Sequence, residues 1–124
     1  MLCTGYSDDI DEQRAKNIGI RAYSGSGNET MLTIEDYIDG MDRDPLTRTV
    51  MLYIESVKDG RRFFESARRV GAQKPVVLMK GGQSEAGTKA ASSHTGALST
   101  DKRIFDAVCR QAGIVKVEQS MDLL

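Results

Sequence analysis

Apolar residues along this chain fall into two kinds of pattern. Short continuous runs, RTVMLYIE in residues 48–55 and KPVVLMK in residues 74–80, are apolar and partly β-branched. Such runs are typical of strands buried on both faces of a parallel sheet. Weaker runs at residues 18–23 and 114–117 predict two further strands. The sequence thus predicts four strands, near residues 18–23, 48–55, 75–80 and 114–117.

Between these strands, apolar residues recur every three or four positions, which predicts helices with one buried face. One helix follows a capping residue at Thr33 and stops at Asp44 and Pro45. A second helix runs from a cap at Asp59 to Gly71. A third helix follows a cap at Ser99 or Thr100 and ends before Gly113. The predicted buried faces are Ile34, Tyr37, Ile38 and Met41; Phe63, Phe64, Ala67 and Val70; and Ile104, Phe105, Val108 and Ala112.

This sustained alternation of strand and helix predicts an α/β fold. Strand–helix–strand units pair their strands in parallel, and the helices then cover both faces of the sheet. We therefore expect a flavodoxin-like, doubly wound, mostly parallel sheet. The last residues, 120–124, are expected to begin a further helix.

The amino-terminal stretch fits this pattern poorly. Residues 1–17 have no strand-like run, and only Ile10 and Ala15 are candidates for a buried stripe. We interpret 1–17 as a polar, weakly helical segment and 18–124 as the folded domain, in a sheet that lacks its first strand. The edge exposed by such a gap would favour pairing with a partner or a second copy.

Size and charge narrow the class of protein. With 124 residues the chain is long enough for one domain with its own core. Its formal net charge of −1, with interspersed signs, argues against binding to nucleic acid. The one basic cluster, Arg61, Arg62, Arg68 and Arg69, alternates with acidic and apolar residues, which favours a solvated helix face.

Neither a disulfide, a metal site nor a membrane span is indicated. Cys3 and Cys109 lie far apart and outside any CxxC pattern, which supports neither a disulfide framework nor a zinc site. No apolar stretch approaches the length of about 20 residues that crosses a bilayer. A cytoplasmic protein is the expectation.

The candidate chemistry centres on the single histidine of the chain. His94 lies in KGGQSEAGTKAASSHTGALS, residues 80–99, a stretch of small and polar residues directly after a predicted strand. Hydroxyls and open backbone amides around an imidazole suit an anion such as phosphate. The alternatives are that His94 is an ordinary surface residue and that the stretch is merely disordered.

Position supports the chemical interpretation. Ligands of open α/β sheets gather at the carboxyl ends of the strands, where this stretch begins and where Glu55 ends the preceding strand. A carboxylate that binds one ring nitrogen fixes the histidine tautomer and leaves the other nitrogen free to attack phosphorus. We expect Glu55 to orient His94; the alternative is a strand-end carboxylate that accepts backbone or lysine hydrogen bonds.

Together these segments resemble a known family. KPVVLMKGGQSEAGTKAASSHTGALS, SGSGNETMLTIEDYIDGM and LYIESVKDGRRF are similar to the phosphohistidine domain of NDP-forming acyl-CoA synthetases, the acetate–CoA ligase (ADP-forming) group, which is related to the succinyl-CoA synthetase α subunit. The resemblance covers roughly residues 18–124. It implies a ligase component, incomplete alone, that carries a phosphohistidine intermediate between acyl phosphate and ADP.

The resemblance also implies roles for individual residues. His94 matches the phosphorylated histidine and Glu55 the glutamate that holds its imidazole. Gly81 and Gly82 match the glycines that let the chain leave its strand. Ser93, Thr95 and Gly96 flank the phosphorylated ring, and the SGSGN turn that ends at Asn28 offers backbone amides for phosphate, although such turns are also plain connectors.

The chain departs from the family pattern in what it lacks. It contains no GxGxxG fingerprint, no serine-glycine turn near its amino terminus and no ATP-grasp domain. The resemblance therefore implies no cofactor bound by this chain alone: ATP or ADP, Mg²⁺ and CoA would bind partner domains, an ATP-grasp subunit and a CoA-binding domain, in a homo- or hetero-oligomer. A stand-alone subunit and a truncated gene both fit this pattern.

Two other functions compete with a phosphoryl carrier. One is a non-catalytic interaction or regulatory module, a relic that keeps the fold without the reaction. The other is a receiver or flavin-binding domain of the same architecture, which the sequence favours less because it shows neither an acidic cluster nor a hydroxyl-rich loop after a first strand.

Overall fold

A computed structural model describes residues 2–4, 22–25, 31–81 and 101–123 of the chain. Its five strands are β1 (Leu2–Thr4), β2 (Tyr23–Gly25), β3 (Val50–Ile54), β4 (Val76–Lys80) and β5 (Ile114–Val117). All are paired in parallel in the order β2-β1-β3-β4-β5. This is the flavodoxin-like order, and it confirms the predicted fold class.

The amino-terminal prediction needs one correction. Residues 2–4 form β1, which lies inside the sheet between β2 and β3, with Leu2 in register with Tyr23 and Met51. The place of the strand expected to be missing is therefore filled. Three residues are too few to give a periodic pattern, so β1 forms because it has two neighbours. Because β1 is interior, the argument for a partner at a missing strand does not hold.

Another strand lies later than predicted. β2 begins at Tyr23, and Ser24 and Gly25, which the sequence assigned to a turn, pair with Cys3 and Thr4. The predicted strand residues 18–21 and the predicted weak helix in 5–17 lie outside the described part of the chain.

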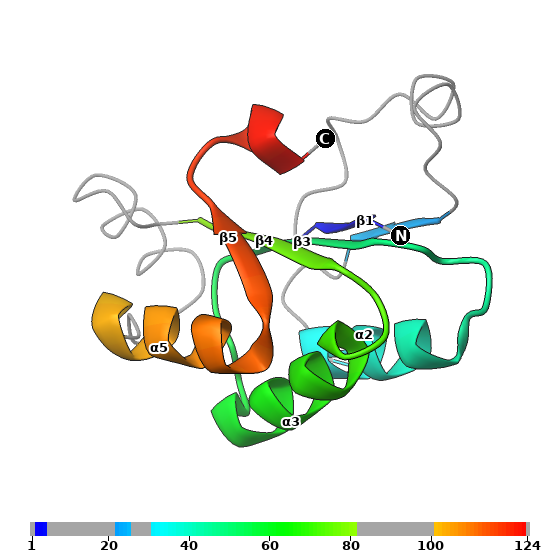
Figure 1. Ribbon diagram of the computed structural model, residues 1–124, viewed down its shortest axis with the longest axis horizontal. Helices are drawn as coiled ribbons and strands as arrows, with labels where there is room; N and C mark the ends of the chain where they lie inside the picture. The colour runs from blue at the N-terminus through cyan, green and yellow to red at the C-terminus, as the bar shows by residue number, and fades with distance from the viewer. Residues whose placement is uncertain (1, 5–21, 26–30, 82–100, 124) are drawn as a thin grey trace.

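Helices α2 (Ile34–Arg43), α3 (Gly60–Gly71) and α5 (Lys102–Ala112) lie on one side of the sheet, and the 3-10 helix η1 (Ser120–Leu123) lies on the other (Figure 1). Thr33 and Asp59 cap α2 and α3 as predicted. The cap of α5 is Asp101, whose carboxylate accepts a hydrogen bond from the Arg103 amide, rather than Ser99 or Thr100. A carboxylate caps as well as a hydroxyl and also complements the positive end of the helix dipole.

The core lies between the three helices and one face of the sheet. Phe63 of α3 stacks on Phe105 of α5 at 6.2 Å between ring centroids. Ile104, predicted to be buried, is 61% exposed, because the buried face of α5 consists of Phe105, Cys109 and Ala112, of which the sequence did not assign Cys109. The buried apolar residues are Ile34, Ile38, Met41, Val50, Leu52, Ile54, Phe63, Ala67, Val70, Val76, Leu78, Phe105, Cys109, Ala112 and Ile114.

Candidate functional site at the carboxyl edge of the sheet

The candidate site lies where strands β3 and β4 end side by side. Ile54, the last residue of β3, is in register with Lys80, the last residue of β4. The Gly81 amide donates a hydrogen bond of 2.8 Å to the Ile54 carbonyl and extends the pairing by one step. Glu55 follows Ile54 directly, so Glu55, Lys80 and Gly81 meet at the edge where parallel sheets bind ligands.

Gly81 is a glycine because of the space around it. A Cβ atom at this position would lie 2.6 Å from the Tyr53 hydroxyl oxygen and 3.3 Å from Cγ of Glu55. The missing side chain therefore lets the chain leave β4 directly past the side chains of Tyr53 and Glu55. A larger residue at this position would need the Tyr53 ring to shift.

The surroundings of Tyr53 keep its hydroxyl protonated. Burial raises the pKa of the Tyr53 hydroxyl, and the negative charge on Glu55 raises it further. The phenol therefore stays protonated at neutral pH and remains a hydrogen-bond donor at the edge of the site.

Lys80 brings a positive charge to the same edge. Its ammonium donates a hydrogen bond of 3.3 Å to the Glu55 carbonyl and lies 5.5 Å from the centroid of the Phe105 ring. Burial lowers the pKa of Lys80, the positive charge of Lys116 lowers it further, and Glu55 acts in the opposite direction.

Lys116 of β5, in contrast, is fully engaged. Its ammonium pairs with Asp106 of α5 at 2.7 Å and with Glu118 at 3.2 Å. Burial would lower the pKa of Lys116, but these two hydrogen bonds outweigh it and raise the pKa. Nearby, burial and then the charge of Asp106 raise the pKa of the Cys109 thiol to about 11, so this cysteine is an unreactive core residue.

The structure places two of the residues that the sequence singled out. Glu55 and Gly81 adjoin at the carboxyl edge, as predicted. The sequence interpretation missed Lys80 and Tyr53, although a lysine at the end of an otherwise apolar run was a visible signal. The other candidate residues, His94, Gly82, Ser93, Thr95, Gly96 and Asn28, lie outside the described residues.

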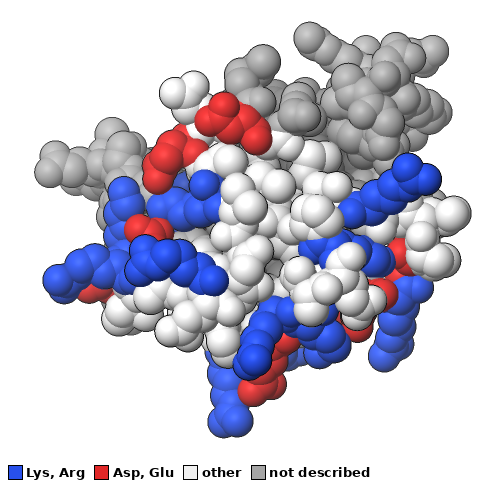
Figure 2. Space-filling view, viewed as in Figure 1, with Lys and Arg blue, Asp and Glu red and all other residues white. Residues whose placement is uncertain are grey.

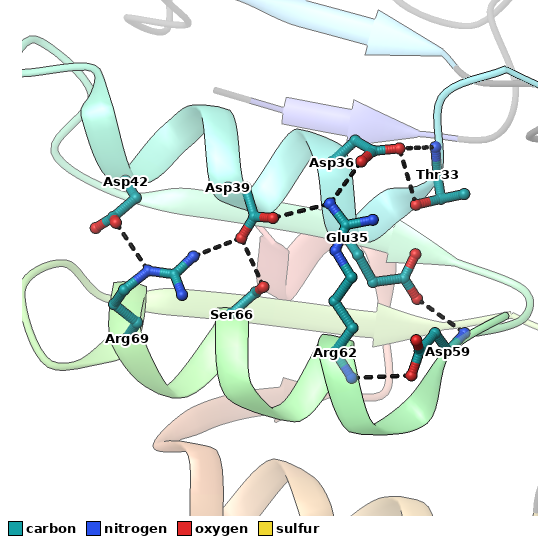
Figure 3. Close-up of polar contacts among 9 residues, drawn as sticks. All are labelled: Thr33, Glu35, Asp36, Asp39, Asp42, Asp59, Arg62, Ser66 and Arg69. Atoms are coloured by element: carbon teal, nitrogen blue, oxygen red, sulfur yellow. Dashed lines mark hydrogen bonds and ion pairs between the residues drawn. The ribbon is translucent and has the colours of Figure 1, made fainter.

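A second group of charges joins helices α2 and α3 (Figure 3). We call it the α2–α3 ladder: the carboxylates Asp36, Asp39 and Asp42 of α2 face Arg62, Ser66 and Arg69 of α3. Arg62 pairs with Asp36 at 2.6 Å and with Asp39 at 2.9 Å, and Arg69 pairs with Asp42 at 2.9 Å and also with Asp39.

The α2–α3 ladder changes the interpretation of the predicted basic cluster. Arg62 and Arg69 pair across two helices instead of facing solvent alone, while Arg61 pairs with Glu65 on its own helix. Lys and Arg are interspersed with Asp and Glu on the face drawn in Figure 2. Two of the four arginines, Arg62 and Arg69, thus also join α3 to α2, while all four are exposed, in agreement with the predicted solvated face.

The described residues hold neither a cluster of metal ligands nor a membrane-spanning helix. Within the described ranges, no three His, Cys, Asp or Glu side chains gather as a metal site would require. In those same ranges no helix is both long and apolar enough to cross a membrane.

A parallel sheet in the order β2-β1-β3-β4-β5, covered by helices, defines the class of flavodoxin-like α/β domains. Comparison with known proteins is more specific: the family described as "Succinyl-CoA ligase like flavodoxin domain" matches residues 7–124. The chain belongs to this family.

Individual relatives agree. The chain is 39% identical over 101 residues to the acetate–CoA ligase [ADP-forming] I subunit alpha of Pyrococcus furiosus, covering 82% of this chain and 22% of the relative. It is 40% identical over 118 residues to acetate–CoA ligase [ADP-forming] II of Archaeoglobus fulgidus, covering 94% of this chain and 17% of the relative. The chain thus spans about a fifth of the curated relatives it matches.

A solved structure extends the match to three dimensions. The dinucleotide-forming acetyl-coenzyme A synthetase 1 of Ca. Korarchaeum cryptofilum, in complex with phosphate and ADP, superposes with a TM-score of 0.88 at 30% identity. The superposition covers 98% of this chain and 28% of that one. The chain is therefore homologous to one domain of ADP-forming acyl-CoA synthetases.

Proposed function

We propose that this chain is the phosphoryl-carrying component of an ADP-forming acyl-CoA synthetase and that His94 is the residue phosphorylated. The observation that carries the proposal is Glu55 at the carboxyl edge of the sheet, beside the glycine from which the His94 stretch begins. The family match and the 39% identity to an ADP-forming ligase subunit support it.

The chemistry assigned to each residue follows from its type. The Glu55 carboxylate accepts a hydrogen bond from one nitrogen of His94, and the other nitrogen attacks the phosphorus of an acyl phosphate. An N–P bond forms, the P–O bond to the acyl oxygen breaks, and a carboxylate leaves. The phosphoryl group then passes from His94 to ADP, which becomes ATP.

This division of labour requires partners. ATP or ADP and Mg²⁺ would bind an ATP-grasp subunit, and CoA would bind a CoA-binding domain, within a cytoplasmic homo- or hetero-oligomer. Because the chain spans about a fifth of its relatives, the complete reaction is assigned to the assembly and not to this chain.

Labelling tests the proposal directly. We would incubate the chain with a partner ATP-grasp subunit, Mg²⁺ and ATP labelled at the γ-phosphate. We expect acid-labile, base-stable label on the chain, absent in His94→Ala and at least tenfold lower in Glu55→Gln, about the effect of losing one charge-assisted hydrogen bond.

The matched control is Glu65→Gln, which changes an exposed carboxylate that pairs with Arg61 on α3. It is expected to label like the unchanged protein. Equal labelling of the unchanged protein and His94→Ala would contradict the proposal. A stable complex with the partner and no label on any variant would instead favour the non-catalytic interaction module.

A further inference from the structure

Two lysines stand at opposite ends of strand β4 and have different surroundings. Lys74 precedes the strand and Lys80 ends it. Both are half-buried, and both donate hydrogen bonds to backbone carbonyls. We therefore compare the hydrogen bonds of these two ammonium groups.

Lys74 is held by the fold. Its ammonium donates to the carbonyls of Met41 and Asp44, both at 2.6 Å. These carbonyls lie at the carboxyl end of α2, where a helix exposes unpaired oxygen atoms and the negative end of its dipole. A structural role explains Lys74.

Lys80 is held much less firmly. Its one hydrogen bond is 3.3 Å long, and no carboxylate pairs with it among residues 2–4, 22–25, 31–81 and 101–123. The ammonium lies over the Phe105 ring, 5.5 Å from its centroid, and Lys80 itself is in register with Ile54, the residue before Glu55. A half-buried ammonium without a strong acceptor is costly to the fold, and an anionic ligand would offset that cost.

We propose that the Lys80 ammonium binds the oxygen atoms of a phosphoryl anion at the carboxyl edge of the sheet. That this anion is the phosphoryl group carried by His94 rests on the proposed function. Lys80 is the last residue of β4 and directly precedes Gly81, so the strand places it at the start of the His94 stretch.

The charges around Lys80 agree with this assignment. Lys116 already pairs with Asp106 and Glu118, so these two carboxylates are engaged. Glu55 is the carboxylate whose charge favours the Lys80 ammonium, and burial and Lys116 together lower the pKa of Lys80. A bound dianion is expected to raise this pKa.

The first experiment uses the chain and inorganic phosphate alone. Phosphate is titrated into the unchanged protein, Lys80→Met and Lys74→Met, and followed by NMR of the backbone amides and the lysine ε-CH₂ groups. We expect saturable shifts at Gly81 and Lys80, a dissociation constant about tenfold higher or more in Lys80→Met, and no change in Lys74→Met, because a charge-assisted hydrogen bond is lost only in the first.

Two additional measurements separate binding from structure. Saturating phosphate is expected to raise the pKa of the Lys80 ammonium. Lys80→Arg, which keeps the charge, is expected to recover part of the affinity, and Lys80→Gln replaces Lys80→Met if the latter fails to fold. Phosphate that does not bind, or binds all variants equally, would overturn the proposal.

Labelling with the ATP-grasp partner distinguishes the two proposals. Phosphate binding that depends on Lys80, without label on His94, would leave Lys80 as an anion site and refute the phosphoryl carrier. Label on His94 that is unaffected in Lys80→Met, together with unchanged phosphate binding, would support the carrier and refute the role of Lys80. Loss of both phosphate affinity and label in Lys80→Met supports both.

Discussion

Charged side chains are used in opposite ways in two regions of this molecule. In the α2–α3 ladder, carboxylates of one helix meet guanidiniums of the other at hydrogen-bond distance, and Arg62 bridges two carboxylates. At the carboxyl edge, the charge of Glu55 favours the Lys80 ammonium, yet the ammonium donates its hydrogen bond to the Glu55 backbone carbonyl, at 3.3 Å. Paired charges stabilise the fold, whereas the loosely engaged charge is available to a ligand at some cost in stability.

Breaking the α2–α3 ladder is expected to have the largest effect on stability. Asp39 accepts hydrogen bonds from Arg62, Ser66 and Arg69, and Ser66 is 2% exposed. Asp39→Ala should lower the free energy of unfolding by about 2–3 kcal/mol, mostly because the buried Ser66 hydroxyl loses its acceptor. Urea unfolding measures this loss.

The control for that change is Asp39→Asn, which keeps an acceptor for Ser66 and should cost less. The double variant Asp39→Ala/Ser66→Ala leaves no unpaired hydroxyl. It should therefore lose less free energy of unfolding than the two single variants lose together. Full additivity would contradict a direct coupling between Asp39 and Ser66.

The α2–α3 ladder should also make stability depend on pH in acid. The backbone hydrogen bond from Thr33 and the hydrogen bond from Arg62 lower the pKa of Asp36. Burial would raise the pKa of Asp39, but the hydrogen bonds from Ser66, Arg62 and Arg69 outweigh burial and lower that pKa. A carboxyl with a lowered pKa contributes stability above its unfolded pKa of 3.8, which is lost as pH falls through the folded value.

This acid dependence is measured by urea unfolding between neutral pH and pH 3, with Asp39→Asn as the matched variant. The slope of stability against pH below about pH 4 should be shallower in the variant, since one of the shifted carboxyls is gone. An unchanged slope would show that Asp39 does not contribute.

The next largest effect is expected at the amino end of β4. Lys74→Met removes hydrogen bonds to two carbonyls of the α2 terminus and should lower the free energy of unfolding by about 1–2 kcal/mol. Lys74→Arg, which keeps the charge and donors, is the control. If Lys74→Met and Lys80→Met lower the free energy of unfolding equally, the two lysines do not differ in their role in the fold.

Much of the fold could be predicted because its signals are local. The runs at 48–55, 75–80 and 114–117 contain β3, β4 and β5, and the caps at Thr33 and Asp59 start α2 and α3. β1 could not be found, because a three-residue strand carries no period and depends on neighbours far along the chain.

The candidate site was predicted less completely for a similar reason. Glu55 and Gly81 were found because each follows a strong strand, but Lys80 was interpreted only as the end of an apolar run. Its significance depends on what surrounds its ammonium, namely Phe105 of α5 and Lys116 of β5, and these contacts are non-local. The partners of Arg62 and Arg69 were missed in the same way.

Crowding the carboxyl edge tests whether its open geometry is required. Gly81→Ala places a Cβ against the Tyr53 hydroxyl and Cγ of Glu55. Because the hydroxyl end of the Tyr53 ring then has to move, the free energy of unfolding should fall by about 1 kcal/mol. The displaced Glu55 should also lower phosphohistidine labelling more than stability alone explains. The control is Gly40→Ala, at an exposed position of α2 where a Cβ meets nothing within 4 Å, and it should stabilise the protein slightly.

The smallest expected effect on stability is at Lys80 itself. Lys80→Met removes a poorly paired cation and keeps its apolar stem, so the free energy of unfolding should change by less than about 0.5 kcal/mol. Because the folded pKa of Lys80 lies below its ordinary value of 10.5, the unfolded chain binds more protons between the two values, and stability rises with pH there. This rise should be absent in Lys80→Met and retained in Lys74→Met. A loss of stability in Lys80→Met as large as in Lys74→Met would show that Lys80, too, is held for the fold, and the two ends of β4 would then be alike.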